Sequence, residues 1–270
     1  MASPYVPLDA RGWRLAMGLR PLDLAAWLEV DEHYEEELAL KTQLLEEQYD
    51  VVVATESAGN DASLELLIEI RGNLRAHHPG VSTAIHKDEH PIVAASRFVQ
   101  EDLCVLVRDD AWRLRAACVC FPSRWNLATK IGTTLDEIHQ PVPGYDDELA
   151  RPTNAFFDRL KPDRAFWRLN WTLLDSPVLY QPAVVRRSPS GRLDDWYFRV
   201  ERQTLRALPR SNAVVFTIRT YVTSAATLRE RDDTFVSTLL HSLDTAPASV
   251  QSYKGWTGVA ERLRAALDQD

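Results

Sequence analysis

Five segments of this chain have the composition of β-strands, and a long helical stretch separates the second from the third. They are rich in β-branched and aromatic residues and cover residues 103–107, 112–121, 165–174, 196–205 and 213–222. Turn sequences at 108–111 and 209–212 join the first two and the last two, and a loop is predicted at 186–191. Antiparallel strands on both sides of a helical crossover predict an α+β fold, with helices packed on one face of an antiparallel sheet.

Helical periodicity surrounds these strands. Apolar residues recur at helical spacing in segments 24–45 and 63–77, in the crossover at 122–138 and 147–160, and in the tail at 234–243 and 259–267. We therefore predict a helical N-terminal extension (1–90), a core (91–224) and a helical C-terminal extension (225–270) that form one compact unit. The core has the order of strands and crossover used by PAS domains, an analogy of topology that says little about function by itself.

The composition argues against several classes of partner and cofactor. With 31 basic and 39 acidic residues the net charge is −8, and the resulting field repels nucleic acid and anionic lipid. No apolar run reaches the roughly 20 residues of a membrane span, and the N-terminus lacks the apolar core of a signal peptide, so we expect a cytoplasmic protein. Three cysteines without a CxxC motif disfavour disulfides, structural zinc and covalently attached haem, and the 10 glycines form no nucleotide-binding loop.

His139 has the most informative setting of the seven histidines. It ends an amphipathic helix of the predicted crossover, and the two prolines in Pro141–Pro143 cannot continue that helix. A neutral imidazole held there can ligate a metal or a haem iron while an acceptor orients its second nitrogen. The spacing alone favours a capping or core role for His139, and a solvated or packing role for each of the other six histidines.

Several long motifs resemble one known family. They are Cys120–Gly132 continuing to Ile138–Tyr145, Arg199–Pro209 followed by Phe216–Tyr221, and the shorter Gly18–Asp23 and Asn170–Trp171. Through these motifs, most of the chain resembles the haem-dependent oxidative N-demethylase family.

The resemblance implies a PAS-like domain that holds haem b and oxidises a small secondary amine, such as dimethylamine, with dioxygen. In that family the haem subunit works with a reductase that takes electrons from NADPH through flavin and an iron–sulfur cluster. Reductase motifs are missing from this sequence, so the resemblance also implies a separate reductase protein and a homo- or hetero-oligomer. The family contains many members without an assigned substrate.

A haem site requires an axial ligand, an apolar slot and cations for the propionates. Under the resemblance, we assign His139 as the iron ligand. Trp125, Leu127, Ile131 and Phe216 are candidates for the slot, and Lys130, Arg124, Arg202 and Arg219 are candidates for the propionates. Each of these cations can equally be an exposed or ion-paired strand residue.

Glu201 is the candidate for binding a cationic amine. Period-two alternation places it on one strand face with Arg199 and Gln203, a polar run within an otherwise apolar segment. A carboxylate beside haem would attract and orient the ammonium group, and Tyr221 and Thr217 would complete a polar pocket. The alternative role of Glu201 is a salt bridge to Arg199 or to Arg219.

Three alternatives stay open at the level of the sequence. Cys118 or Cys120 can replace His139 as a thiolate ligand, although a buried strand cysteine is more often a small hydrophobe. The protein can be a haem sensor or haem-carrying protein without amine turnover, since PAS-like folds often bind a ligand and signal its presence. It can also be an interaction protein that retains the fold and has lost haem.

Overall fold

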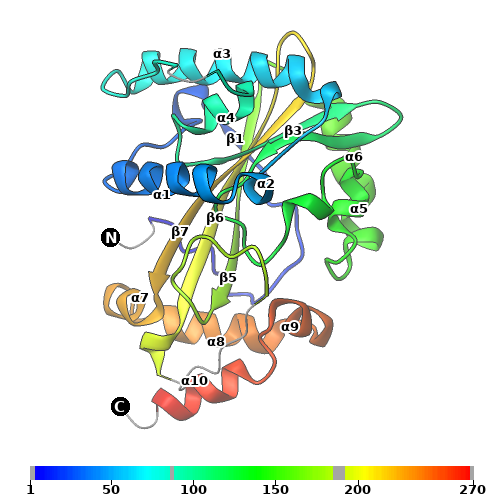
Figure 1. The fold of residues 1–270 in the computed structure, drawn as a ribbon. Helices are drawn as coiled ribbons and strands as arrows, with labels where there is room; N and C mark the ends of the chain where they lie inside the picture. The colour runs from blue at the N-terminus through cyan, green and yellow to red at the C-terminus, as the bar shows by residue number, and fades with distance from the viewer. Residues whose placement is uncertain (1–3, 86–87, 185–191, 268–270) are drawn as a thin grey trace.

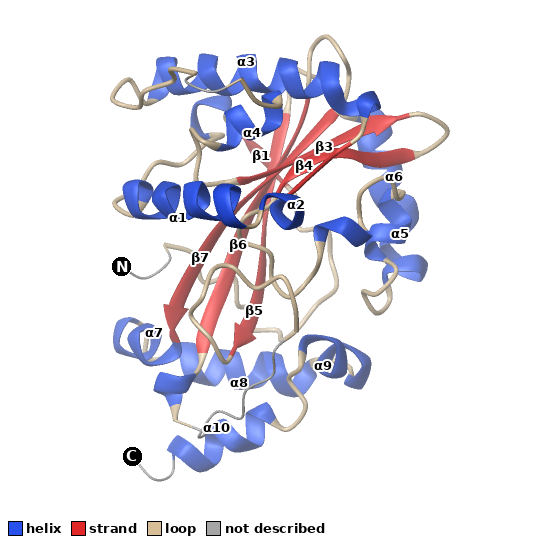
Figure 2. Cartoon of the chain, in the orientation of Figure 1, coloured by secondary structure: helices blue, strands red, loops and turns tan. Residues whose placement is uncertain are grey.

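The centre of the protein is a seven-stranded antiparallel sheet, seen between the helices in Figures 1 and 2. The computed structural model describes residues 4–85, 88–184 and 192–267, so the predicted loop at 186–191 lies outside the described residues. In the order β1-β5-β6-β7-β3-β4-β2, the sheet comprises β1 (Arg20–Leu22), β2 (Val53–Thr55), β3 (Asp102–Arg108), β4 (Trp112–Cys118), β5 (Ala165–Leu174), β6 (Tyr197–Ala207) and β7 (Val214–Ser224).

The five predicted strands are β3 to β7, and the α+β class is confirmed. β3 and β7, the first and last of the five, lie side by side, so the chain must cross the sheet between β4 and β5. This order does not conflict with the PAS-like topology, which stays a prediction, as do the domain boundaries. The predicted helical extension also supplies the two edge strands β1 and β2, whose three residues each are too short for a period-two pattern.

Helices lie around the sheet as Figure 1 shows. Those described are α1 (Tyr34–Glu47), α2 (Tyr49–Val52), α3 (Asn60–His77), α4 (Pro91–Ser96), α5 (Leu135–His139), α6 (Ala150–Arg159), α7 (Ala225–Arg231), α8 (Phe235–Thr245), α9 (Ala248–Lys254) and α10 (Val259–Leu267). Helices were correctly predicted at α3, α6, α8 and α10. None of them, within the part of the chain that the structure describes, is long and apolar enough to cross a membrane.

Two predicted helices are shorter than expected. In 24–45, only a 3-10 turn at Leu24–Ala26 precedes α1, which begins at Tyr34. In 122–138, a 3-10 turn at Leu127–Thr129 and α5 replace a continuous helix. The side chain of Asn126 accepts a hydrogen bond from the backbone of Ala128, and Gly132 has a φ of +75°, so local capping and a left-handed residue interrupt the helix.

The two faces of the sheet have different coverings. We call the face that carries Arg168, Glu201 and Phe216 the crossover face, because α5, α6 and the Leu127–Thr129 turn cover it. We call the opposite face, with Arg202 and Arg219, the extension face. At one end α1, α3 and α4 pack on the extension face, and at the other end α7 to α10 do so.

Candidate functional site

His139 is positioned by the short helix α5. Thr134 caps this helix: its Oγ1 accepts a hydrogen bond from Glu137 N at 3.2 Å, while the Glu137 carboxylate accepts from Thr134 N at 2.7 Å. This reciprocal capping box supports a helix of only five residues. Leu135 and Ile138 pack into the apolar cluster of the crossover face, so α5 presents its last residue to the same side of the sheet.

The hydrogen bond of His139 determines its tautomer. Nδ1 lies 2.8 Å from the carbonyl oxygen of Leu135, which can only accept, so Nδ1 carries the proton and Nε2 has the lone pair. Burial lowers the pKa of His139, with a smaller contribution from Arg168 and Lys130, so the ring is neutral at pH 7. Tyr145 stacks on the imidazole at 4.7 Å between ring centroids. Among the described residues Nε2 has no hydrogen-bond partner.

The predicted apolar slot lies on this face. Leu127 is buried, and Trp125, Ile131 and Phe216 are partly buried against the same cluster as α5. Lys130 is here too, since its Nζ donates to the carbonyl of Ile138 at 2.9 Å, next to His139. Burial lowers the pKa of Lys130. The structure thus brings these predicted residues to the same face as His139.

Arg168 is a site residue that the sequence analysis missed. It lies on the crossover face of β5, opposite Gln203 of β6, and its Nε is buried without a partner. No hydrogen bond or ion pair joins Arg168 to another described residue. Burial lowers the pKa of Arg168, and the charge of Glu201 opposes that shift. The available signal was a lone arginine in the aromatic strand Ala165–Leu174, on the same face as Asn170.

Glu201 is held by two side-chain amides on the crossover face. Asn170 Nδ2 and Gln203 Nε2 both donate to Glu201 Oε2, at 3.2 and 3.0 Å. Oε1 lies 3.7 Å from Nε of Arg199, so the predicted alternative of a salt bridge to Arg199 exists alongside the amide contacts. Arg199 itself donates to the backbone carbonyls of Phe121 and Leu179. The carboxylate therefore keeps one oxygen without an amide partner.

Arg202 and Arg219, two predicted propionate partners, are not brought to His139. Alternation on β6 and β7 places both on the extension face. Arg202 donates to backbone carbonyls of Ala26 and Trp27 and lies 3.4 Å from a Glu29 oxygen. Arg219 pairs with the carboxylates of Asp31 and Glu37, at 2.7 Å each. The same period-two rule that grouped Arg199, Glu201 and Gln203 already separates residue 202 from them.

Tyr221 and Thr217, the predicted companions of Glu201, also lie on the extension face. Tyr221 donates its hydroxyl proton to Glu29 at 2.6 Å. Thr217 is buried and exchanges a hydrogen bond of 2.7 Å with Thr204. The polar side chains that contact Glu201 are instead Asn170, Gln203 and Arg199.

The two cysteines considered as alternative ligands are likewise on the extension side. Cys118 and Cys120 are fully buried in the apolar cluster beneath α1, α3 and α4. The hydrogen bond with Cys118, together with burial, raises the pKa of the Cys120 thiol. The sheet separates both sulfur atoms from His139.

Arg124 lies at the end of β5 rather than beside His139. Its guanidinium pairs with Asp175, and its Nε donates to Gln181 Oε1 at 3.1 Å. It lines a cavity of about 210 Å³ at this end of the sheet.

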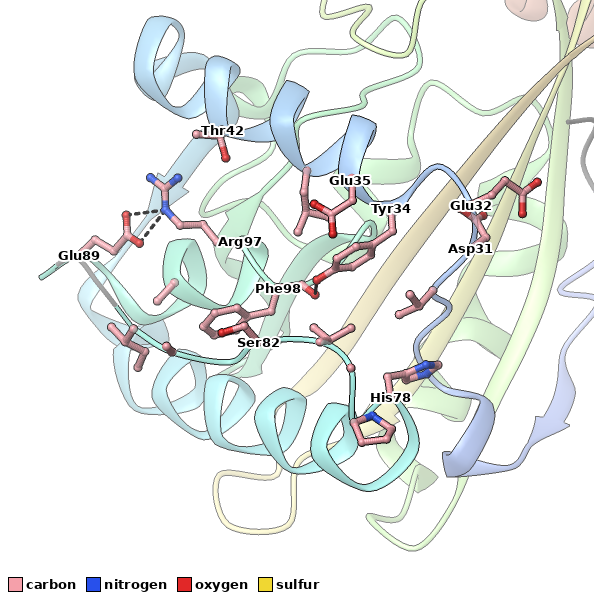
Figure 3. A pocket seen from close by; sticks show the side chains of 18 residues that line it. Asp31, Glu32, Tyr34, Glu35, Thr42, His78, Ser82, Glu89, Arg97 and Phe98 are labelled. Carbon is pink, nitrogen blue, oxygen red and sulfur yellow. Dashed lines mark hydrogen bonds and ion pairs between the residues drawn. The ribbon is translucent and has the colours of Figure 1, made fainter.

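A larger cavity, of about 860 Å³, lies on the other side of the molecule between α1, α4 and the loop after α3 (Figure 3). None of the predicted site residues lines it. Two of its polar side chains already have partners: Tyr34 donates to the carbonyl of Phe98 at 2.9 Å, and Arg97 pairs with Glu89 at 2.8 Å.

The crossover face fits a haem group in its donor set. The described residues hold no cluster of three or more metal-ligating side chains, but haem iron needs only axial ligands from the protein. An imidazole with a free Nε2, a guanidinium without a partner and an apolar wall are the groups that haem requires. The fold and site thus define an α+β protein whose antiparallel sheet gathers these groups on one face.

The comparison with protein families gives a specific result. The family described as haem-dependent oxidative N-demethylase, alpha subunit-like, matches residues 18–264. The chain belongs to this family, and the resemblance predicted from the motifs is confirmed.

Proposed function

We propose that this protein is a haem b oxidoreductase subunit that catalyses oxidative N-demethylation of a small secondary amine, such as dimethylamine, with dioxygen. The observation that carries the proposal is the tautomer of His139, whose Nε2 lone pair lies on the same sheet face as the Glu201 carboxylate. Membership of the family supports the reaction class.

Haem would be held by residues of the crossover face. His139 would supply a nitrogen ligand, and its bond to the Leu135 carbonyl makes that nitrogen a stronger donor. Trp125 and Phe216 would contact the ring, while Arg168 and Lys130 would pair with the propionates. When bound, haem supplies the iron at which dioxygen is activated.

Glu201 would bind the substrate as an ammonium ion. Its Oε2 accepts from Asn170 and Gln203, which leaves Oε1 to accept an N–H of the amine. Because the carboxylate is mostly buried, its attraction for the cation is stronger than it would be in water. Oε1 also takes the ammonium proton, so that the neutral amine is oxidised. With dimethylamine, one dioxygen, two electrons and two protons yield methylamine, formaldehyde and water.

The electrons would come from a separate NADPH-linked flavin and iron–sulfur reductase. The family description as an alpha subunit supports an assembly of more than one subunit. Part of the acidic surface, with its net charge of −8, would form the docking area. A cytoplasmic location, as expected from the sequence, would give access to NADPH.

Absorption spectra test the proposal directly. We expect a Soret band after haem addition, a shift on dithionite reduction, and loss of the histidine-ligated spectrum in His139→Ala. His241→Ala, in α8, is the matched control and keeps the spectrum. An unchanged spectrum in His139→Ala contradicts the ligand assignment.

Amine turnover separates an enzyme from a haem sensor. With a reductase system, dimethylamine should raise oxygen consumption and release formaldehyde, and Glu201→Gln should raise the KM for the amine by roughly tenfold or more. Gas binding to ferrous protein without amine-dependent oxygen consumption would favour the sensor instead.

A further inference from the structure

The cavity at the end of β5 is lined by more basic than acidic residues, whereas the whole chain has a net charge of −8. We call it the end pocket; its polar lining comes from Arg124, Asp175, Trp196, Ser252, Lys254, Thr257 and Arg262. It measures about 210 Å³ and lies where the end of β5 meets the segment before β6 and the region of α9 and α10. His139, Arg168 and Glu201 do not line it.

The charge of the end pocket is positive. Three of its side chains are cationic and one, Asp175, is acidic, in a chain whose net charge is −8. Asp175 pairs with Arg124. Lys254 donates to the carbonyl of Trp171 at 2.7 Å, and among the described residues Arg262 bonds to the carbonyl of Thr257, at 3.5 Å. Neither bond neutralises a charge. Burial lowers the pKa of Lys254 to about 8 and the Glu201 carboxylate opposes this shift, so Lys254 is mostly charged at pH 7 and the pocket keeps an excess of positive charge.

Trp196 forms part of the wall of the end pocket. The residue is 4% exposed, and its indole N–H has no hydrogen-bond partner among the described residues. Because the indole ring lines the pocket beside the cations, its N–H resonance is sensitive to a ligand bound there.

Arg124 is held in an uncommon conformation at the pocket wall. Its φ is +61°, in the left-handed region that non-glycine residues rarely adopt. Its backbone N–H donates to the carbonyl of Gln181 at 2.7 Å, and its side chain also bonds to Gln181 and to Asp175. These contacts fix the guanidinium in place before any ligand arrives.

We propose that the end pocket binds a small oxyanion, a phosphate or a carboxylate group, through Lys254 and Arg262, with Trp196 in the pocket wall. The volume is below the roughly 300 Å³ of the smallest drug-sized sites, so the pocket takes one anionic group. None of the residues proposed to hold haem lines this pocket, although the charges of Glu201 and Arg168 act on Lys254, and the proposal does not depend on the proposed function.

The indole resonance of Trp196 reports the binding. In ¹⁵N-labelled full-length protein, sodium phosphate or sodium acetate is titrated at constant ionic strength, and Trp196→Phe identifies the signal among the eight tryptophans. We expect one of the two anions to give a saturable shift of this resonance. Preference for phosphate or for acetate assigns the ligand class, and the absence of a saturable shift with both overturns the proposal.

Variants on one helix separate specific binding from general charge effects. Arg262→Gln should raise the Kd by roughly tenfold. Arg264→Gln removes an arginine of the same helix α10 that pairs with Asp244 outside the pocket, and should leave the Kd unchanged. Equal effects of the two variants would overturn the proposal.

Equilibrium dialysis of the anion against haem-free and haem-loaded protein completes the test. We expect the same Kd in both, because the site is separate from the crossover face. Loss of anion binding when haem is present would mean that the end pocket belongs to the haem site, and would overturn the proposal.

Discussion

The two faces of the central sheet carry arginines that differ in their ion pairs. On the extension face, Arg219 is fully buried and pairs with Asp31 and Glu37. On the crossover face, Arg168 is partly buried, and no described residue pairs with its guanidinium. Unpaired buried charge costs several kcal/mol, so a folded chain pairs it or supplies a ligand. The comparison indicates that an arginine paired within the chain has a structural role, whereas an arginine left unpaired marks a candidate binding site.

The largest expected effect comes from Arg219→Met. Removing the guanidinium leaves two carboxylates in a buried setting, which should lower the free energy of unfolding by about 3–5 kcal/mol. Urea denaturation of the haem-free protein measures this loss as a lower midpoint with an unchanged slope. Arg264→Met, which removes an exposed pair with Asp244, should cost less than about 1 kcal/mol. Similar midpoints for both variants would contradict the structural role of Arg219.

Asp102 is a buried carboxylate whose hydrogen-bond donors are backbone N–H groups. Its carboxylate accepts hydrogen bonds from the backbone of Cys120 and Phe121, yet burial raises its pKa from 3.8 to about 6. The native state thus keeps a proton that the unfolded state releases, so stability falls as pH rises from about 4 to about 6. At 1.36 kcal/mol for each pKa unit, the loss is up to about 3 kcal/mol.

Asp102→Asn should remove this part of the pH dependence. Urea midpoints at about pH 4 and pH 7, compared between the wild type and the variant, give the measurement. Asp61→Asn, at an exposed position of α3, is the control and should follow the wild type. The same pH dependence in Asp102→Asn as in the wild type would contradict the assignment of the proton to Asp102.

Arg168→Met should have the opposite profile to Arg219→Met. Because Arg168 has no partner to lose among the described residues, the haem-free protein should be as stable as the wild type or more stable. Haem affinity should fall roughly tenfold, the value of one charge-assisted hydrogen bond. Soret titration gives the affinity and urea denaturation gives the stability. A loss of stability as large as that of Arg219→Met would contradict the proposal that Arg168 has a binding role and Arg219 a structural one.

The sequence predicted the strands well because each one has a local composition signal. All five central strands, and the common face of Arg199, Glu201 and Gln203, follow from side-chain alternation. Alternation also separates Arg202 from that group, so its assignment to the haem site conflicted with information already in the sequence. Arg124 differs, because its position depends on an irregular loop and a left-handed residue that no periodic pattern encodes.

Arg168 stands out in the sequence as a lone arginine in an aromatic strand, but its distinguishing property, a missing partner, cannot be derived from the sequence. That property depends on what every neighbouring element contributes, including α5 and β6. The helix expected at 122–138 failed for a related reason. Asn126, Gly132 and Thr134 each satisfy or redirect the backbone locally, and their combined effect outweighs a mixed apolar pattern.

The smallest effect we expect compares two helix caps on different sides of the molecule. Thr134 caps α5, which carries His139, and Ser224 caps α7, which packs in the C-terminal cluster. Replacing either residue by alanine removes one capping hydrogen bond and should lower the free energy of unfolding by about 1 kcal/mol. Thr134→Ala should also weaken haem binding, because α5 then holds the imidazole less firmly, whereas Ser224→Ala should leave it unchanged. Equal haem affinity in the two variants would mean that α5 does not position His139. Capping of this helix by Thr134 would then have no effect on cofactor binding.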